Sequence, residues 1–230
     1  MDISRQVFVR SIRMGLVYVI LSIALAVFIS FSFGIASRAG SVVERSGQLF
    51  DLRSVFELMI IPFVAVFGLV ITTPTYLLFV SDKNAGVLEY LLAVGMTQRD
   101  IFKGYLKAAT FLSLVPMVPA LAVTMATSVS GPLDAVWIGG LAIMTGLADV
   151  ALVTFLMIGV NAMQRRPTGM NSPLGITIGV LVVLPEFLLL FLLQGAVIWL
   201  DIGTALTLAV AALGLLLSVD RLILREKLLP

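Results

Sequence analysis

The amino-acid sequence predicts an all-α integral membrane protein with one transmembrane domain over residues 1–230. Its composition supports this prediction, because 60% of the residues are hydrophobic, 12% are charged and the mean hydropathy is +1.13. Soluble globular domains carry about 25% charged residues, roughly twice that share. The spacing of the apolar runs supports it too, because stretches long enough to cross a bilayer as helices, about 20 residues each, recur along the chain.

The residues that are rare or missing exclude several classes of function. The sequence has no cysteine and no histidine, so it lacks the commonest metal ligands and general base, and we predict no metal site. A net charge of +2, with basic residues scattered over loops, gives no indication of nucleic-acid binding. The phosphate-binding pattern G-x-x-x-x-G-K-[ST] does not occur in the sequence, so we expect neither enzyme activity nor a cofactor in this chain.

The first part of the chain consists of a short basic segment followed by two predicted spans. Residues 1–14 are basic, and Arg10 falls close to the apolar face that a helix there would have. The apolar run that follows is too long for a cleavable signal peptide, so we predict a first span over 15–35. A loop of mixed charge over 36–54 leads to a second span over 56–80. Pro62 and Pro74 within this span are expected to free backbone carbonyls and bend the helix.

A polar segment over residues 81–107, here called the polar island, separates the second span from the third. A helix fits residues 84–94. Three apolar side chains share one face of this helix and a carboxylate lies opposite: Val87, Leu88, Leu91 and Glu89. Short side chains able to cap the start of the helix are Ser81, Asp82 and Asn84.

The island is predicted to continue with a break and a second helix. Gly95 stands where helices commonly end on a residue in the left-handed conformation. Thr97, followed three positions later by Asp100, matches the N-cap and N3 positions of a new helix. That second helix is expected to run on into the third span.

The remaining spans follow from the apolar runs after the island. We predict them over 108–129, 135–160, 173–193 and 202–219, with polar connections over 130–134 and 161–172. The apolar run from 173 continues to 200, broken near Pro185 and Gln194. As one straight helix it would be about 40 Å long, against a hydrocarbon core of about 30 Å. A span followed by a broken hairpin therefore fits this run better, and the total is six spans.

The distribution of basic residues predicts the orientation. With six spans, the side that holds the polar island and both termini carries twelve of the fifteen Lys and Arg residues. The other three all fall in the loop over 36–54. Cytoplasmic loops of membrane proteins are enriched in Lys and Arg, so we expect the island and both termini to be cytoplasmic.

The polar island resembles the cytoplasmic loop of ABC-2 type transporter permeases, the membrane subunits of a class of ATP-driven exporters. That loop has a G-T-L-E-x-L-L-like core, a turn and an R-x-E-I-x-x-G-K-like segment. The matching positions are Gly86, Leu88, Glu89, Leu91, Leu92, Arg99, Asp100, Ile101 and Gly104. The departures are Val87 for Thr or Ser, Gly95–Met96 for a turn with proline, and Tyr105 for Lys.

The resemblance implies that the island is a coupling helix that docks on a separate ABC ATPase subunit, which binds ATP and Mg²⁺. The residues assigned to this coupling site are Gly86, Val87, Leu88, Glu89, Leu91, Leu92, Gly95, Arg99 and Asp100. We expect the face of Val87, Leu88 and Leu91 to contact the ATPase, and Glu89 to pair with a basic group there or with Arg99.

The resemblance also carries expectations about the whole protein. It implies export across the plasma membrane of a substrate that the sequence does not name. It implies a dimer, formed with a second copy or with a sister permease. It further implies an interfacial elbow helix at the N-terminus and a re-entrant pair of half-helices before the last span.

Four alternatives remain open. The length and layout also resemble the haem-exporter permease of cytochrome c maturation. The pattern G-V-L-x-x-L-x-x-x-G-M-T-x-x-x-I-F resembles the loop of FtsX/MacB-like mechanotransmission proteins. Those proteins have a sizeable outer domain between their first two spans, whereas this chain has only the short loop over 36–54 there. A membrane enzyme or scaffold without ATP would need clustered catalytic groups, which the sequence does not show. An ordinary interfacial loop also explains a short amphipathic helix.

Two acidic residues fall inside predicted spans, Asp149 in the fourth and Glu186 in the fifth. An ionised carboxylate at the bilayer centre costs on the order of 2.5–3.5 kcal/mol on insertion scales. A functional interpretation places both on the translocation path or in a relay. A structural interpretation makes each a protonated or hydrogen-bonded helix contact, or puts Glu186 at the mouth of a water-filled region.

Overall fold

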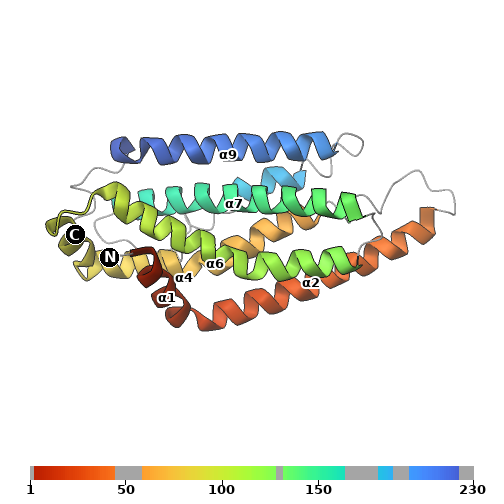
Figure 1. The fold of residues 1–230 in the computed structure, drawn as a ribbon, viewed down its shortest axis with the longest axis horizontal. Helices are drawn as coiled ribbons and strands as arrows, with labels where there is room; N and C mark the ends of the chain where they lie inside the picture. Colours follow the sequence, from red (N-terminus) through yellow and green to blue (C-terminus); the bar gives the residue numbers. More distant parts are fainter. Residues whose placement is uncertain (1–2, 45–58, 128–131, 164–180, 189–196, 223–230) are drawn as a thin grey trace.

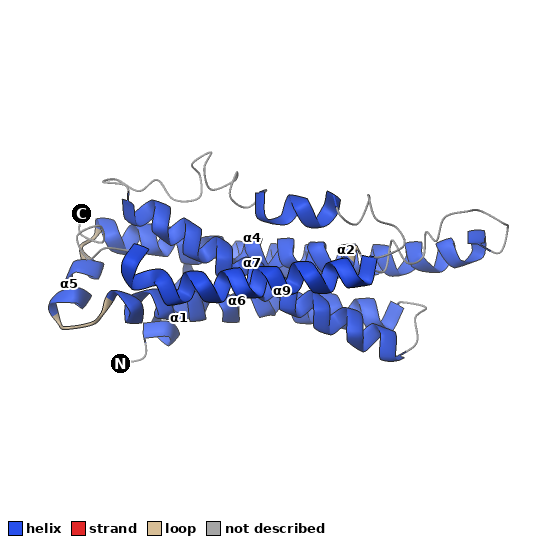
Figure 2. Cartoon of the chain, turned by 90° about the horizontal axis from the view of Figure 1, so that it is seen from above, coloured by secondary structure: helices blue, strands red, loops and turns tan. Residues whose placement is uncertain are grey.

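The computed structural model describes residues 3–44, 59–127, 132–163, 181–188 and 197–222, and every described element is a helix (Figures 1 and 2). In chain order they are α1 (Ile3–Met14), α2 (Leu16–Glu44), α4 (Ile60–Asn84), α5 (Val87–Ala93), α6 (Gln98–Thr127), α7 (Pro132–Met163), a helix over 181–188, and α9 (Val197–Leu222). The predicted all-α class is confirmed for this part of the chain.

Four described helices are long and apolar enough to cross a membrane, over Leu16–Ala36, Ile60–Asn84, Gln98–Thr127 and Val136–Gly159. They correspond to the first four predicted spans. The helix α9 contains a further apolar stretch, Ile202–Leu215. The predicted fifth span over 173–193 lies outside the described residues except for 181–188, as does most of the predicted re-entrant hairpin.

The helix α4 lies at the centre of the bundle, where it packs against α1, α2, α6 and α7. It is the most buried of the four long apolar helices, and α2 is the least buried. One apolar cluster, the main core, joins α2, α4, α6 and α7 with Val183 and Ala205. Within it the ring of Phe63 lies 4.8 Å from that of Phe33 and 5.3 Å from that of Phe187. The other helices are therefore arranged around α4.

The helices α4 and α6 continue past their prolines. Pro62 is the third residue of α4, where the missing N–H breaks no helical hydrogen bond. Pro74 lies inside α4, and Pro116 and Pro119 lie inside α6, and both helices continue past them. Each proline removes one backbone hydrogen bond, and the turns on either side keep theirs.

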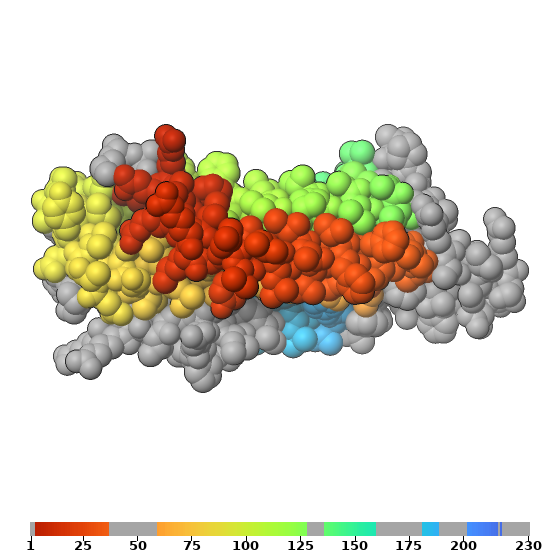
Figure 3. Space-filling model, turned by 90° about the horizontal axis from the view of Figure 1, so that it is seen from below, coloured from red at the N-terminus to blue at the C-terminus, as the bar shows by residue number. Residues whose placement is uncertain are grey.

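The ends of the bundle differ in what they carry. The short helices α1 and α5 lie at one end, together with the end of α7 and the last turns of α9, whereas α9 begins at the opposite end (Figure 1). The space-filling view shows α1 (red) over the same end as the yellow segment that contains α5, while α2 runs along the surface (Figure 3). This end, the α5 end, gathers the residues of the polar island.

A second apolar cluster, here called the end cluster, fills the bundle at the α5 end. Its buried members are Val7, Leu78, Phe79, Leu88, Leu92, Ile101, Phe102, Tyr105, Ala108, Phe155 and Ile158. The rings of Phe79 and Tyr105 meet edge to face at 5.2 Å, and so do those of Phe102 and Phe155 at 5.6 Å. Such contacts fix the ends of α1, α4, α6 and α7 relative to α5.

Candidate coupling site

The short helix α5 lies between two glycines in the left-handed conformation. Gly86, with φ of 72°, precedes its first residue, and Gly95, with φ of 93°, follows its end. Residues with a Cβ atom rarely adopt such φ values, which explains a glycine at both positions. The left-handed end predicted at Gly95 is confirmed.

The predicted start of this helix is wrong. The helix α4 runs on to Asn84, so the three expected capping residues Ser81, Asp82 and Asn84 lie in its last turn. The helix α5 begins only at Val87, three residues later than predicted. The charged residues after Val80 therefore do not mark the end of the helix.

The second helix of the island begins as predicted. The Thr97 hydroxyl donates to Asp100 Oδ2 at 2.7 Å, the Asp100 backbone N–H donates to Thr97 Oγ1 at 3.2 Å, and the Thr97 N–H donates to Asp100 Oδ2 at 3.3 Å. These reciprocal bonds form a capping box at the start of α6. They hold the loop between α5 and α6 in place.

The face of α5 that was expected to contact a partner instead packs against the chain itself. Leu88 is fully buried and Leu92 is 5% exposed, and both belong to the end cluster. Val87 and Leu91 are partly buried, and Leu91 packs against the same cluster. The sequence periodicity correctly places these side chains on one face of the helix. That face packs into the bundle, so the expectation that it is free to contact a partner was wrong.

The opposite face of α5 is open. Tyr90 is 67% exposed and Val94, just after the helix, is 62% exposed; Glu89 and Ala93 are exposed as well. Glu89 and Arg99 form no ion pair in the described structure, contrary to one of the expectations for Glu89. The exposed face thus combines an aromatic ring, an aliphatic side chain and a carboxylate.

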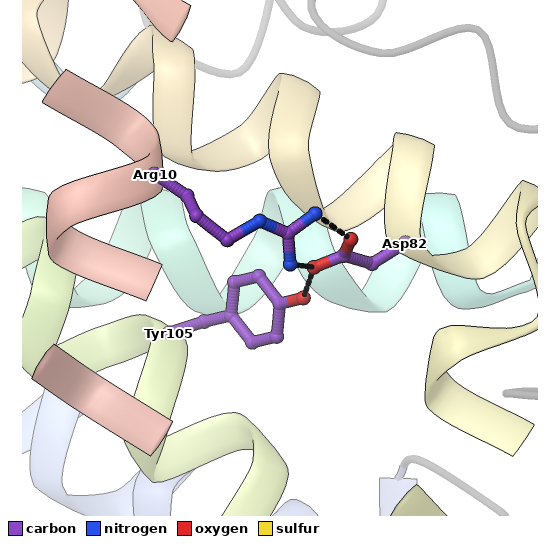
Figure 4. A network of polar contacts seen from close by, with 3 residues as sticks. All are labelled: Arg10, Asp82 and Tyr105. Carbon is purple, nitrogen blue, oxygen red and sulfur yellow. Dashed lines mark hydrogen bonds and ion pairs between the residues drawn. The ribbon is translucent and has the colours of Figure 1, made fainter. Parts of the chain in front are cut away.

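At the α5 end of the bundle, three residues far apart in the sequence form a polar network (Figure 4). The Arg10 guanidinium donates to both Asp82 carboxylate oxygens, from Nη2 to Oδ1 at 2.7 Å and from Nη1 to Oδ2 at 3.1 Å. The Tyr105 hydroxyl donates to the same Oδ2 at 2.5 Å. The carboxylate side chain is only 3% exposed, whereas that of Arg10 is 49% exposed. A bidentate contact of this kind is both strong and directional.

The network ties α1, α4 and α6 together beside α5. The helix α1 also approaches α6 closely: a Cβ atom at Gly104 would lie 2.7 Å from Ile3 Cγ2. The contact explains the need for glycine at Gly104, because any side chain there would displace α1. The helix α5 packs against α4 and α6, and packing and one buried carboxylate hold these two helices to α1.

Sequence reasoning missed this network, although each member gave a signal. Arg10 lies close to the apolar face of a short helix, where a charge needs a partner. Asp82 follows an apolar run directly and was interpreted as a cap. Tyr105 stands where the resembled family commonly has Lys, and here it donates to Asp82. None of these signals identifies the partner, because the residues lie on separate helices.

The two acidic residues predicted within spans lie elsewhere. Asp149 on α7 and Glu186 in the helix over 181–188 are both buried, and their side chains interact electrostatically. The described residues hold no group of three or more His, Cys, Asp or Glu side chains that could bind a metal ion.

Comparisons of this chain with protein-family models, with curated proteins and with solved structures found no match. The resemblance to ABC-2 type permeases therefore rests on the motif positions of the polar island. The structure gives a physical role to several of those positions. Gly86 adopts a left-handed conformation, and Leu88 and Leu92 are buried. Asp100 caps the start of α6, and Gly104 allows α1 to approach α6 closely.

Proposed function

We propose that this chain is the permease subunit of an ATP-driven exporter of the ABC-2 type, and that α5 is the helix through which it binds a separate ATPase subunit. The observation that carries this proposal is the two-sided character of α5. Leu88 and Leu92 anchor the helix in the bundle, while Tyr90 and Val94 project from it.

A coupling element has to meet two physical requirements. It must be held firmly by the permease, because a loose helix would absorb a displacement of the partner without passing it on. It must also offer apolar area to the partner, since aromatic side chains in a desolvated pocket dominate most protein interfaces. The end cluster meets the first requirement, and the exposed ring of Tyr90 meets the second.

The layout of the bundle supports six crossings with both termini on the α5 side. The helix α7 ends at the α5 end and α9 begins at the opposite end, which is the arrangement expected if a fifth span lies between them (Figure 1). Together with the twelve basic residues assigned to that side, this supports a multi-pass protein of the plasma membrane whose α5 end and termini face the cytoplasm.

In this proposal, the ATPase subunit and the permease have different roles. ATP and Mg²⁺ bind to the ATPase subunit, since this chain has no phosphate-binding loop. The permease supplies the path through the membrane. A second copy or a sister permease completes it, as the resemblance implies, and the bilayer surrounds the assembly.

The proposal is tested by reconstitution with ATPase subunits from the same genome, beginning with any that is encoded beside this chain. The two are co-expressed, purified through a tag on this chain and placed in liposomes. We expect a stable complex whose ATP hydrolysis is several-fold faster than that of the ATPase alone. Failure of every such ATPase to bind this folded chain would refute the proposed class.

A further inference from the structure

The exposed face of α1 gathers the basic residues of this helix. Arg5, Arg10 and Arg13 are all exposed. Val7 and Ser11, on the opposite side, are buried. With about 3.6 residues per turn, the three arginines fall within one half of the helix surface. The helix contains no acidic residue, so this face presents only positive charge away from the bundle.

One of these arginines has an internal partner, and two do not. Arg10 donates to both oxygens of the buried Asp82 carboxylate. Arg5 and Arg13 form no ion pair with a described residue. They are eight residues apart on the same side of α1, which separates them by about 12 Å along the helix axis. This distance is too long for one small anion to bridge, so the two guanidinium groups fit two separate anionic groups.

The end of α1 lies at the edge of the apolar part of the bundle. The candidate membrane span of α2 begins at Leu16, two residues after the last residue of α1. Its first side chains, Leu16 and Val17, are exposed, as expected for a surface that faces lipid. Met14 at the end of α1 is exposed too and continues this apolar surface. The exposed face of α1 therefore adjoins the hydrocarbon-facing surface at the level of the lipid headgroups.

The helix α6 shows the same boundary beside the start of α1. Its exposed residues Lys103, Lys107 and Phe111 follow one another at intervals of four, so the stripe changes from charged to apolar within one turn. Gly104, between the two lysines, packs against α1, and a Cβ atom there would lie 2.7 Å from Ile3 Cγ2. The start of α1 thus lies beside the turns of α6 that carry the lysines.

The carboxylates near α1 are already engaged. The helices packed against α1 are α2, α4 and α6. Their acidic residues near α1 are Asp82, which belongs to the polar network, and Asp100, which accepts the hydrogen bonds of the capping box. Asp100 also interacts electrostatically with Lys103 and Arg99. The remaining acidic residue, Glu44, lies at the far end of α2. The charge on the exposed face of α1 is therefore available to anions from outside the bundle.

At this level of a membrane, the abundant anions are phospholipid headgroups. A guanidinium group binds phosphate with two parallel hydrogen bonds, and each Arg near an anionic membrane surface contributes about a fivefold gain in affinity. We propose that Arg5 and Arg13 on the exposed face of α1 bind the headgroups of two anionic phospholipids, with Lys107 adding positive charge beside them. The inference requires that the bundle spans a membrane and does not depend on coupling to an ATPase.

A fluorophore on the exposed face of α1 tests this inference. The chain has no native cysteine, so Val9→Cys, at an exposed position between Arg5 and Arg13, can be labelled specifically. The full chain is placed in phosphatidylcholine liposomes with a small fraction of spin-labelled lipid, which quenches the fluorophore. The spin label is at the top of the acyl chain of either phosphatidylglycerol or phosphatidylcholine. At low salt we expect phosphatidylglycerol to be enriched about fivefold near the fluorophore.

Variants in the same labelled background identify the residues that bind the lipid. Arg5→Gln and Arg13→Gln should each lower the enrichment, and the double variant should bring the ratio of the two lipids close to one. Arg5→Lys/Arg13→Lys keeps the charge and should keep most of the enrichment, while salt should reduce it in the unmodified protein. The matched control is a fluorophore at Val136→Cys, an exposed position at the opposite end of the bundle, where we expect a ratio close to one.

Four results would overturn the inference. The first is equal quenching by the two lipids around α1 at low salt. The second is enrichment that persists in a folded Arg5→Gln/Arg13→Gln variant; if that variant does not fold, an unchanged ratio in both single variants has the same meaning. The third is equal enrichment at Val136→Cys, which would reflect general attraction to the protein. The fourth is loss of the enrichment in inorganic phosphate but not in chloride of equal ionic strength, which would identify a site for free phosphate instead.

Discussion

Replacing Tyr90 with aspartate is expected to weaken binding of the ATPase subunit at least thirtyfold while leaving the bundle folded. Tyr90 is 67% exposed on α5, so a charge there disturbs no internal packing. In the complex, the same charge would enter a desolvated apolar contact. Loss of an aromatic anchor from such a contact costs about 2 kcal/mol or more, which corresponds to this change in affinity. Titration of the purified permease with its ATPase measures the effect.

Matched variants separate this docking effect from general effects of charge and folding. Tyr90→Phe keeps the ring and should bind within about threefold of the wild type. Asn84→Asp adds a negative charge at another exposed position of the polar island and should bind normally. Leu88→Asp places a charge in the end cluster and should prevent stable folding. Wild-type affinity of a folded Tyr90→Asp permease would exclude α5 as the docking helix.

Removing the Arg10 side chain is expected to loosen α1 without displacing α5. In Arg10→Met, the buried Asp82 carboxylate keeps only the hydrogen bond from Tyr105. Because Arg10 is half exposed and water can reach it, we expect a loss at the low end for buried pairs, about 1–2 kcal/mol. This corresponds to a fall of roughly 2–8 °C in melting temperature. The ATPase should still bind, but its stimulation should decrease, since α1 then holds α4 and α6, against which α5 packs, less firmly.

A double-mutant cycle identifies the pair as the cause. Arg10→Met should destabilise the protein clearly less in the Asp82→Asn background than in the wild type, because the carboxylate that needs Arg10 is then gone. Arg10→Lys is the matched control that keeps the charge but loses the bidentate geometry, so an intermediate result is expected. Equal effects of Arg10→Met in both backgrounds would mean that the ion pair does not stabilise α1.

The parts of the coupling site that sequence reasoning predicted correctly depend on short-range signals. The capping box of Thr97 and Asp100 spans four residues, and the glycine at position 95 by itself indicates a left-handed backbone conformation. Both are set by the local chain, so the sequence specifies them. The long apolar helices were predictable for a similar reason, since about 20 apolar residues in a row have few other structures available in a bilayer.

The parts that sequence reasoning missed depend on tertiary contacts. The periodicity of α5 shows that Leu88 and Leu91 share a face, but the other side also presents apolar groups, Tyr90 and Val94. Which side packs inward depends on the end cluster, and several helices build that cluster. In the same way, the donors to the Asp82 carboxylate come from two other helices, α1 and α6. Arg10 lies 72 positions away in sequence.

Site-specific cross-linking tests the central claim, that the outer face of α5 docks on an ATPase. The chain has no native cysteine, so single cysteines can be placed at Tyr90, Val94 and Leu88 and paired with cysteines in the ATPase. We expect cross-linked heterodimers in intact membranes from positions 90 and 94 and none from the buried position 88. If positions 90 and 94 form no cross-link in a complex that hydrolyses ATP normally, α5 is not the docking helix and the account is wrong.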